Sequence, residues 1–302
     1  MQMTAAVWTM LVGLSVLWGG SFFFVEIAVT VLPPLLLVWL RVAIAFAVLA
    51  LFLAAVGRRP PLDRESLVAF AGMGLLNNVV PFTLISWGQT EIASGLAAIL
   101  NALTPVSTML LAHLATTDEK LTRARGLGVV LGLAGVVVLV GPGALAGLGT
   151  AVLAQVAVLG ATLSYGLASL WGRRFRRLGI DPVEAATGQL AASTAILTLP
   201  ALVLTAPWAL PAPGVTVWAA MLGLGTLSTA LAYVLFFRVL QRAGAGNVML
   251  VTLMVPPSAI LLGWLVLDER LGPEHLAGMA LIAAGLVVID GRLAARVSAT
   301  GQ

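Results

Sequence analysis

The sequence predicts an all-α polytopic membrane protein, with ten transmembrane helices arranged as two inverted five-helix repeats around a central cavity. Its 302 residues are 60% hydrophobic and only 9% charged, with a mean hydropathy of +1.07. Soluble domains carry about 25% charged residues, so a chain this poor in charge cannot cover a water-facing surface. The lipid bilayer is therefore its first expected partner. The spacing of basic residues and an internal repeat supply the helix number and the arrangement.

Long apolar segments divide the chain into helices. A helix that crosses a bilayer needs about 20 residues. Charges, prolines and glycines separate segments of about this length, and two longer charge-free runs each contain a turn-like break, "GPGALAGLG" (141–149) and "APWALPAPG" (206–214). The predicted helices span 6–29, 34–56, 66–88, 92–116, 122–141, 149–172, 181–206, 214–238, 243–267 and 274–291.

The basic residues follow this division. With a cytoplasmic N-terminus, every Lys and Arg except Arg41 and Arg270 falls on the cytoplasmic side of ten helices. The positive-inside rule therefore predicts cytoplasmic N- and C-termini. The sequence pI near 10.6 reflects these charges between apolar segments, so nucleic acid is not expected as a partner.

The second half of the chain repeats the first. "GLAAILNALTPVSTMLLAHLATTDEKL" (95–121) resembles "GNVMLVTLMVPPSAILLGWLVLDERL" (246–271), with Pro105 matching Pro256. The repeat unit is five helices, an odd number, so the second copy enters the membrane from the other side. We expect the two units to be residues 1–145 and 146–302. Inverted repeats are typical of transporters whose site lies between the halves near mid-membrane.

Several stretches together carry a family resemblance: "LWGGSFFF" (17–24), "WLR" (39–41), "NNVVPFTLISWGQ" (77–89), "ALAYVLFFRVL" (230–240) and "MVPPSAILLGWLVLDERL" (254–271). Over nearly all its length the chain resembles the EamA type of the drug/metabolite transporter superfamily. The resemblance implies two inverted halves around a central cavity, alternating access, and export of amino acids or related metabolites, aromatic ones included. It also implies the inner (plasma) membrane of a bacterium.

We therefore expect a membrane transporter that exports a small-molecule substrate, with amino acids as the leading class, as a monomer or weak homodimer. An integral membrane receptor or sensor is an alternative, although the chain has no room for a sensory or output domain. An intramembrane enzyme is a second alternative, but it would need a nucleophile with a base, or a metal cluster. The chain has no Cys and two distant His, so we expect no catalytic residue, metal or cofactor.

Two adjacent amides, Asn77 and Asn78, lie in an apolar helix shortly before Pro81. An amide that faced lipid would leave its donors and acceptors unpaired, at a cost of several kcal/mol. Pro81 has no N–H, so it should free the carbonyl of Asn77 and favour a kink. The amides either line a cavity at this kink or bond neighbouring helices.

Further candidates follow the same logic. Asn101 and Pro105 repeat the four-residue spacing, and Pro256 with Pro257 correspond to them in the second half. These prolines either act as gates or form static kinks. Aromatic faces and hydroxyls would suit an amphipathic solute. The remaining substrate-binding candidates of this kind are Trp18, Ser21, Ser164, Tyr165 and Tyr233. Since the first half has Trp18-Gly19 where the second has Tyr165-Gly166, the halves need not contact substrate equivalently.

Glu26 lies about 12 Å beyond Trp18 toward the end of the first helix, and Arg41 lies about 10 Å into the second, so we expect the two at similar depth. Opposite charges in a low-dielectric region should pair, so a structural ion pair is expected. The alternative is that Arg41 binds a substrate carboxylate directly. Glycines in the fifth and tenth helices, including Gly132 and Gly285, predict close helix packing.

Overall fold

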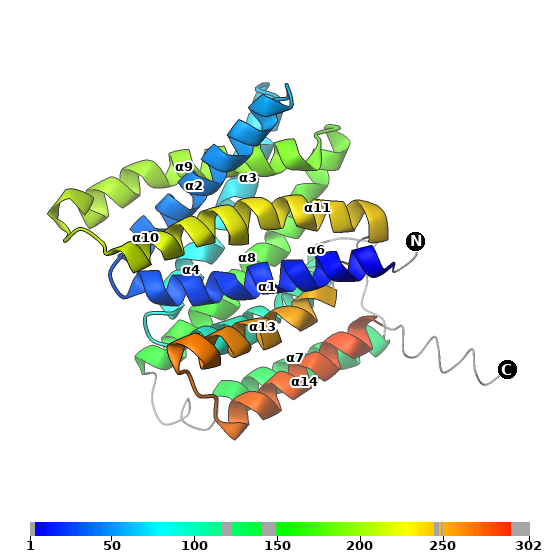
Figure 1. The fold of residues 1–302 in the computed structure, drawn as a ribbon. Coiled ribbons are helices and arrows are strands. Elements are labelled where there is room, and N and C mark those ends of the chain that lie inside the picture. Colours follow the sequence, from blue (N-terminus) through cyan, green and yellow to red (C-terminus); the bar gives the residue numbers. More distant parts are fainter. Residues whose placement is uncertain (1–3, 116–122, 141–148, 245–247, 249, 291–302) are drawn as a thin grey trace.

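The computed structural model describes residues 4–115, 123–140, 149–244, 248 and 250–290, and within them the chain is a bundle of helices (Figure 1). Eight helical segments are long and apolar enough to cross a membrane: Ala5–Val29, Pro34–Ala55, Arg64–Gly88, Ser94–Ala115, Thr150–Arg177, Pro182–Thr205, Val215–Ala243 and Leu250–Leu267. Two shorter apolar stretches, Gly126–Val138 and Pro273–Val288, accompany them. The chain is therefore a multi-pass membrane protein.

Several of these segments are built from more than one helical element. The elements are α1 (Ala5–Val29), α2 (Pro34–Ala55), α3 (Arg64–Gly74), η1 (Leu75–Val79), α4 (Val80–Gly88), α5 (Ser94–Asn101), α6 (Thr104–Ala115), α7 (Arg123–Val140), α8 (Thr150–Arg177), α9 (Pro182–Thr205), η3 (Pro207–Ala209), α10 (Val215–Leu222), η4 (Gly223–Leu231), α11 (Ala232–Ala243), α13 (Leu250–Leu267) and α14 (Pro273–Asp290). Of these, η1 and η4 are π-helical and η3 is a 3₁₀ turn.

Two predicted helix ends are wrong. The helix predicted over 149–172 continues to Arg177, and the one predicted over 214–238 continues to Ala243. Arginines ended the apolar pattern in both cases without ending the helix. A cation in the last turn is stabilised by the negative end of the helix dipole, and its long side chain can reach water. The break predicted at "GPGALAGLG" lies mostly outside the described residues.

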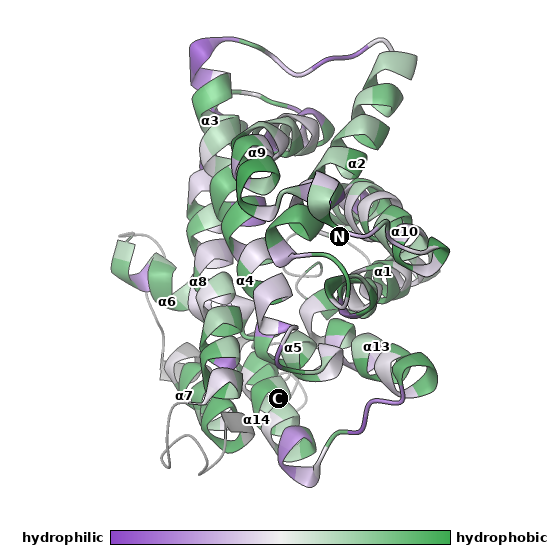
Figure 2. Cartoon of the chain, turned by 90° about the vertical axis from the view of Figure 1, so that its left-hand side faces the viewer, coloured by the Kyte–Doolittle hydropathy of each residue, from purple (hydrophilic) through white to green (hydrophobic). Residues whose placement is uncertain are grey.

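Helices distant in the sequence form the main contacts: α1 packs against α13, α2 against α9, and α7 against α14. Two hydrophobic clusters fill the interior, one between α1, α5, α8 and α13 and the other around α2, α9 and α10. Figure 2 shows that the helices are mostly hydrophobic, while hydrophilic residues gather in connecting segments such as the one between α2 and α3. Exposed apolar side chains such as Leu51 and Leu204, which are 72% and 75% exposed, suit a lipid-facing surface.

The glycine faces of α7 and α14 meet as predicted. A Cβ added at Gly285 would lie 2.6 Å from the carbonyl oxygen of Gly128, and one at Gly135 would lie 2.8 Å from that of Gly278. Real Cβ atoms do not approach so closely. The absence of side chains at these positions therefore allows the two backbones to touch.

The prolines act differently in the two halves. The segment Ser94–Ala115 is broken at residues 102–103, just before Pro105, so α5 and α6 are separate. In contrast, α13 continues through Pro256 and Pro257. The paired bends are therefore not alike.

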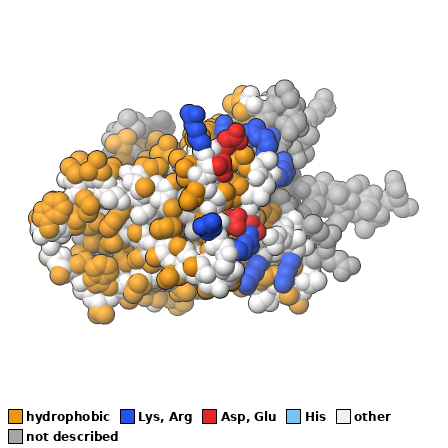
Figure 3. Space-filling view, turned by 90° about the horizontal axis from the view of Figure 1, so that it is seen from above, with side chains coloured by type: hydrophobic (Ala, Val, Ile, Leu, Met, Phe, Trp, Pro, Cys, Tyr) orange, Lys and Arg blue, Asp and Glu red, His pale blue; other side chains and the backbone are white. Residues whose placement is uncertain are grey.

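Charged side chains gather toward one end of the bundle (Figure 3). We call this the basic end; the segments that reach it are the α2–α3 connection, the end of α8 and the end of α11. The arginines described there are Arg58, Arg59, Arg64, Arg173, Arg174, Arg176, Arg177, Arg238 and Arg242. The α1–α2 turn and the end of α13 lie at the opposite end, on the left of Figure 1.

Candidate functional site

The two amides, Asn77 and Asn78, meet a tyrosine and two polar residues of α9. Asn77 Nδ2 donates to Tyr233 Oη at 3.0 Å and to Gln189 Oε1 at 3.2 Å. Asn78 Nδ2 donates to Ser193 Oγ at 2.9 Å, and Tyr233 Oη donates to Asn78 Oδ1 at 2.9 Å. This amide–tyrosine cluster joins η1, α9 and α11, so two residues predicted from the first half meet Tyr233 of the second.

The two amides differ in exposure. Asn78 is fully buried, and both its nitrogen and its oxygen have partners. This is the arrangement that the helix-bonding alternative expects. Asn77 is only partly buried, and no described residue donates a hydrogen bond to its Oδ1. Asn77 thus keeps an acceptor that a ligand could use.

The helix continues through Pro81 and is π-helical just before it, so the hydrogen-bond register differs by one residue from the expected one. The Val80 N–H donates to the carbonyl of Leu75, five residues earlier. In this register the carbonyl left without a donor by Pro81 is that of Leu76, not that of Asn77. Ser164 Oγ donates to Leu76 O at 2.6 Å. Ser164, predicted to contact substrate, therefore satisfies the carbonyl that the proline orphans.

Arg41 is buried within α2, with only 6% of its surface exposed. Its Nε donates to Thr229 Oγ1 at 3.0 Å, and its guanidinium lies 3.6 Å from the centroid of the Phe82 ring. No acidic side chain of the described chain pairs with it. The guanidinium has five N–H donors, and the described contacts use one of them.

Arg41 and the amide–tyrosine cluster belong to one site. Thr229 precedes Tyr233 by four residues in the same span, and Phe82 follows Asn78 by four residues in another. The two partners of Arg41 thus come from the same two spans that supply Tyr233 and Asn78 to the cluster.

The expected ion pair between Glu26 and Arg41 is not formed. Glu26 Oε2 accepts a hydrogen bond from Gln89 Nε2 at 2.8 Å, while Arg41 turns to Thr229. Gln89 Nε2 also donates to the carbonyl of Phe22 at 2.9 Å. The residues share a depth but lie on helix faces that point to different neighbours, because α1 and α2 make few contacts with each other.

The other candidates lie around this centre. Trp18 packs against Phe236 of α11, with ring centroids 5.6 Å apart. Tyr165 packs against both hydrophobic clusters. Ser21 is buried, and the Oδ1 of Asn101 has no hydrogen-bond partner in the described chain. No described hydrogen bond joins Trp18, Ser21 or Asn101 to the amide–tyrosine cluster.

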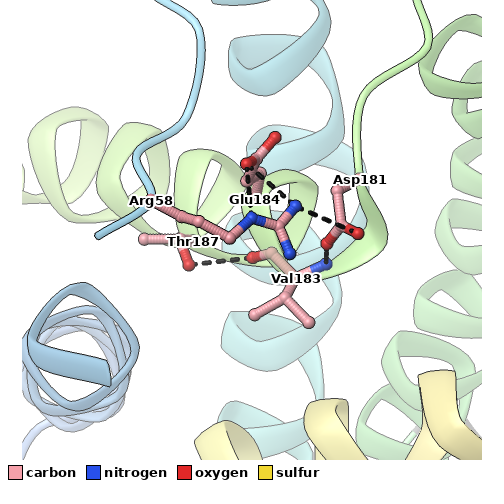
Figure 4. Close-up of polar contacts among 5 residues, drawn as sticks. All are labelled: Arg58, Asp181, Val183, Glu184 and Thr187. Carbon is pink, nitrogen blue, oxygen red and sulfur yellow. Dashed lines mark hydrogen bonds and ion pairs between the residues drawn. The ribbon is translucent and has the colours of Figure 1, made fainter. Parts of the chain in front are cut away.

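An ionic contact crosses the basic end. Arg58, in the α2–α3 connection, lies 3.1 Å from Asp181 Oδ2 and 3.0 Å from Glu184 Oε1 at the start of α9 (Figure 4). The Asp181 carboxylate is the main cause that raises the pKa of Arg58 above its usual value. Asp181 also accepts the Val183 N–H, so the same carboxylate caps α9.

A second charged contact lies at the opposite end. Glu269, after α13, accepts hydrogen bonds from the Ser94 N–H at 2.9 Å, the Ser94 hydroxyl at 3.0 Å and the Gly95 N–H at 3.2 Å. The helix that follows Glu269 in the sequence is α14, which begins at Pro273. Glu269 caps α5 instead, and this N-terminus belongs to the other half of the chain.

Several site residues were missed by sequence reasoning. Gln189 carried a usable signal, since it is an amide in a charge-free run, as Asn77 is. Ser193 and Thr229 carried none, because a hydroxyl can bond its own helix, as Thr229 does to Leu224 O. Phe82 carried no signal either, because it is an ordinary apolar residue in an apolar helix.

Comparison with known proteins identifies relatives along the whole chain. A model of the EamA-like transporter family matches residues 5–141 and again residues 152–290. The uncharacterized transporter YoaV of Bacillus subtilis (strain 168) is 26% identical over 283 residues, which cover 91% of this chain and 94% of YoaV. The uncharacterized inner membrane transporter YedA of Escherichia coli (strain K12) is 28% identical over 92% of this chain and 87% of its own.

Two further similarities bear on fold and substrate. A probable terminal-alkyne amino-acid exporter of Streptantibioticus cattleyicolor is 27% identical over 303 residues, which cover 98% of this chain and 97% of the exporter. A solved crystal structure shares the fold, with a TM-score of 0.65 and 22% identity over 93% of this chain and 96% of the other.

Proposed function

The chain belongs to the EamA-like transporter family and is a membrane transporter, and on that premise we propose that it exports amino acids by alternating access across a bacterial inner membrane. The substrate class rests on the site described above and on the relative named as a probable amino-acid exporter. The inner membrane is supported by YedA, whose name gives that location. We propose that both termini lie in the cytoplasm, in keeping with the positive-inside rule.

Ten spanning helices form two inverted halves, residues 1–145 and 146–302. The helix contacts support this arrangement, because corresponding helices make corresponding contacts. The first span, α1, packs on the ninth, α13, and their counterparts α8 and α6 also pack together. The α4–α8 contact matches that of η4 with α1, and the α3–α9 contact matches that of η4 with α2. The third and eighth spans both contain a π-helix.

The single observation that carries the substrate proposal is the buried guanidinium of Arg41 without an acidic partner. An unpaired charge in a membrane span is costly, and such residues mark substrate or ion pathways. A guanidinium offers a planar fork of N–H donors that fits a carboxylate bidentately. The α-carboxylate of an amino acid would therefore complete the coordination of Arg41, with the free Oδ1 of Asn77 as an acceptor for the ammonium group.

Aromatic side chains around this point suit an amphipathic substrate. Phe82 lies under the guanidinium, Tyr233 belongs to the amide–tyrosine cluster, and Trp18 packs with Phe236 on the same helix as Tyr233. Ligand sites of this type combine apolar walls with a few placed polar groups. We propose Trp18, Ser21 and Tyr165 as further lining residues.

Alternating access is supported by charged contacts between the halves at both ends. Arg58 holds Asp181 and Glu184 at the basic end, and Glu269 holds the start of α5 at the opposite end. Opening either side requires breaking the contact there. Pro81, Pro105 and Pro256 with Pro257 are proposed as gating positions.

The test is counterflow in proteoliposomes with labelled aromatic and aliphatic amino acids. Each is compared with its amide and with its decarboxylated amine, which lack the carboxylate. We expect exchange of the amino acid only, and a loss of at least about tenfold in Arg41→Gln, corresponding to ~1.4 kcal/mol. Arg59→Gln, at an exposed arginine outside the site, serves as control. Equal exchange of the amine would overturn carboxylate recognition, and absence of flux with every amino acid would overturn the substrate class.

A further inference from the structure

A groove of about 830 Å³ runs along the last turns of α8, away from the amide–tyrosine cluster. Leu76, Leu167 and Leu170 line its apolar part, Trp171 follows, and the arginines between 173 and 177 line the remainder. Ser164 bonds the carbonyl of Leu76, so this leucine lies at the height of the first residues of the groove on α8. The groove is therefore apolar toward the membrane interior and cationic toward the basic end.

The wall of the groove is fixed by specific contacts. Trp171 Nε1 donates to the carbonyl of Ala69 at 3.0 Å, and its ring fills the space beside Gly72. The guanidinium of Arg174 lies 3.4 Å from the centroid of the Trp171 ring. Phe175 packs against Phe70 with centroids 5.7 Å apart. This part of α8 is thus held on α3 in one orientation.

The dimensions of the groove match those of one lipid leaflet. Leu167 and Arg177 are ten residues apart on α8, which corresponds to about 15 Å along the helix. The hydrocarbon core of a bilayer is about 30 Å thick, so one leaflet contributes about 15 Å. A phospholipid whose phosphate reaches the arginines would lay its acyl chains along the leucines. A soluble anion would leave that apolar part uncovered.

The charge favours an anionic headgroup over a zwitterionic one. Arginine binds phosphate bidentately, and basic clusters on the cytoplasmic side of transmembrane helices recognise anionic lipids. The carbonyl end of α8 carries a negative partial charge, so the arginines and not the helix end supply the attraction. Arg176 and Arg177 are exposed, and the nearby Asp181 and Glu184 are held by Arg58. A choline or ethanolamine cation would be repelled by these arginines.

We propose that this groove is a binding site for an anionic phospholipid of the leaflet at the basic end. Positive-inside topology accounts for the sign of the charges, but it does not require a groove with an apolar half. The site is independent of the transported substrate, and its ligand stabilises the contact between α3 and α8 from the membrane side.

The test uses purified, delipidated full-length protein and thermal melts with added phosphatidylglycerol or phosphatidylcholine of the same acyl chains. Native mass spectrometry counts the retained lipids. We expect phosphatidylglycerol to raise Tm more than phosphatidylcholine, and this difference to disappear in Arg176→Gln/Arg177→Gln. Arg238→Gln/Arg242→Gln, which removes two exposed arginines from α11 at the same end, should keep it.

Leu167→Trp, which fills the apolar part and leaves every charge, should also lose retained phosphatidylglycerol. Equal stabilisation by both lipids would overturn the proposal. Equal loss in the α11 variant would assign the effect to net charge alone. Stabilisation by glycerol 3-phosphate to the same extent would assign it to a soluble anion.

Discussion

Tyr233 Oη donates a hydrogen bond to Asn78 Oδ1 at 2.9 Å, and through this bond α11 is tied to the π-helix η1. The same hydroxyl accepts the bond from Asn77 Nδ2. A single oxygen atom thus connects both amides of the first half to the second half of the chain. The contact lies one helical turn from the Thr229 hydroxyl that binds Arg41.

Removing this hydroxyl should cost both stability and transport. Tyr233→Phe leaves Asn78 Oδ1 buried without a donor, and an unsatisfied buried group costs about 1–3 kcal/mol. We expect a lower Tm and slower counterflow. Tyr165→Phe is the matched control for the melts, because Tyr165 is the only other tyrosine and makes no described hydrogen bond. Equal melting of the two variants would show that the Tyr233 bond contributes nothing.

Substitutions of Asn77 and Asn78 should have different effects on stability and transport. Asn78→Ala removes the acceptor of the Tyr233 hydroxyl and one of the hydrogen bonds of Ser193, both at a fully buried position, so we expect a lower Tm and a lower folded yield. Asn77→Ala should keep the folded yield but reduce transport by about tenfold, because Asn77 retains an acceptor for substrate. Both are measured by size-exclusion chromatography, melts and counterflow. The opposite order of the two variants would contradict the assigned roles.

Arg41 should contribute little to stability. Since no described acid pairs with it, Arg41→Gln removes a buried charge without orphaning another, so its Tm should equal or exceed that of the wild type. Glu26→Ala should lower Tm through the loss of the Gln89 bond. The charge exchange Glu26→Arg with Arg41→Glu should rescue nothing. A partial rescue would mean that the two residues do pair in the membrane.

Glu269 should hold the end opposite the basic end closed. In Glu269→Gln an NH2 group faces the N–H donors of α5, so we expect a loss of about 1 kcal/mol in stability, as for a lost helix cap. Asp268→Asn is the control: it removes a neighbouring charge, and Asn suits the positive φ of that residue, 56°. Hydrogen exchange at the start of α5 should increase in the first variant and not in the second. Unchanged protection in Glu269→Gln would rule out this contact as a closure.

A pH effect is expected at the start of α3. Hydrogen bonds from the Ser66 hydroxyl and N–H lower the pKa of Asp63 below its ordinary 3.8. A lowered carboxyl pKa contributes stability above the unfolded-state pKa and loses it as pH falls through the folded-state pKa. The Tm of Asp63→Asn should therefore lie below that of the wild type at pH 7, and the difference should shrink below pH 3.8. A difference that stays constant with pH would exclude the charged form as its cause.

Hydropathy and punctuation predicted most helix bounds because the membrane allows few alternatives. The helix predicted over 34–56 is observed as Pro34–Ala55, and the break at "APWALPAPG" is observed as Ala206 in the left-handed region followed by a 3₁₀ turn. The amides were found for the same reason, since an unpaired polar group in a span requires a partner.

The direction in which a side chain points could not be predicted from counting. Glu26 and Arg41 were expected at the same depth. The Glu26 carboxylate instead accepts a hydrogen bond from Gln89, and the Arg41 guanidinium donates to Thr229. Which partner each side chain finds depends on how four helices pack. The long π-helix Gly223–Leu231 contains no proline and gives no sequence signal. This π-helix changes the direction in which the side chains after it point, and the position of Tyr233 beside Asn77 follows from that change.

The two π-helices differ in whether the π turn, which is wider than an α turn, can shift along the helix. Pro81 lies two residues after the end of η1 and cannot supply the N–H that a shifted register would need, so the π turn of the first half is fixed in place. No proline lies in η4 or α11, from Gly223 to Ala243. A wide turn that moves along this stretch rotates each residue it passes by about 100° relative to its neighbours. Tyr233 lies in that stretch. We therefore expect residues of the second half to rotate about their helix axis during transport, while the π-helix of the first half stays in place.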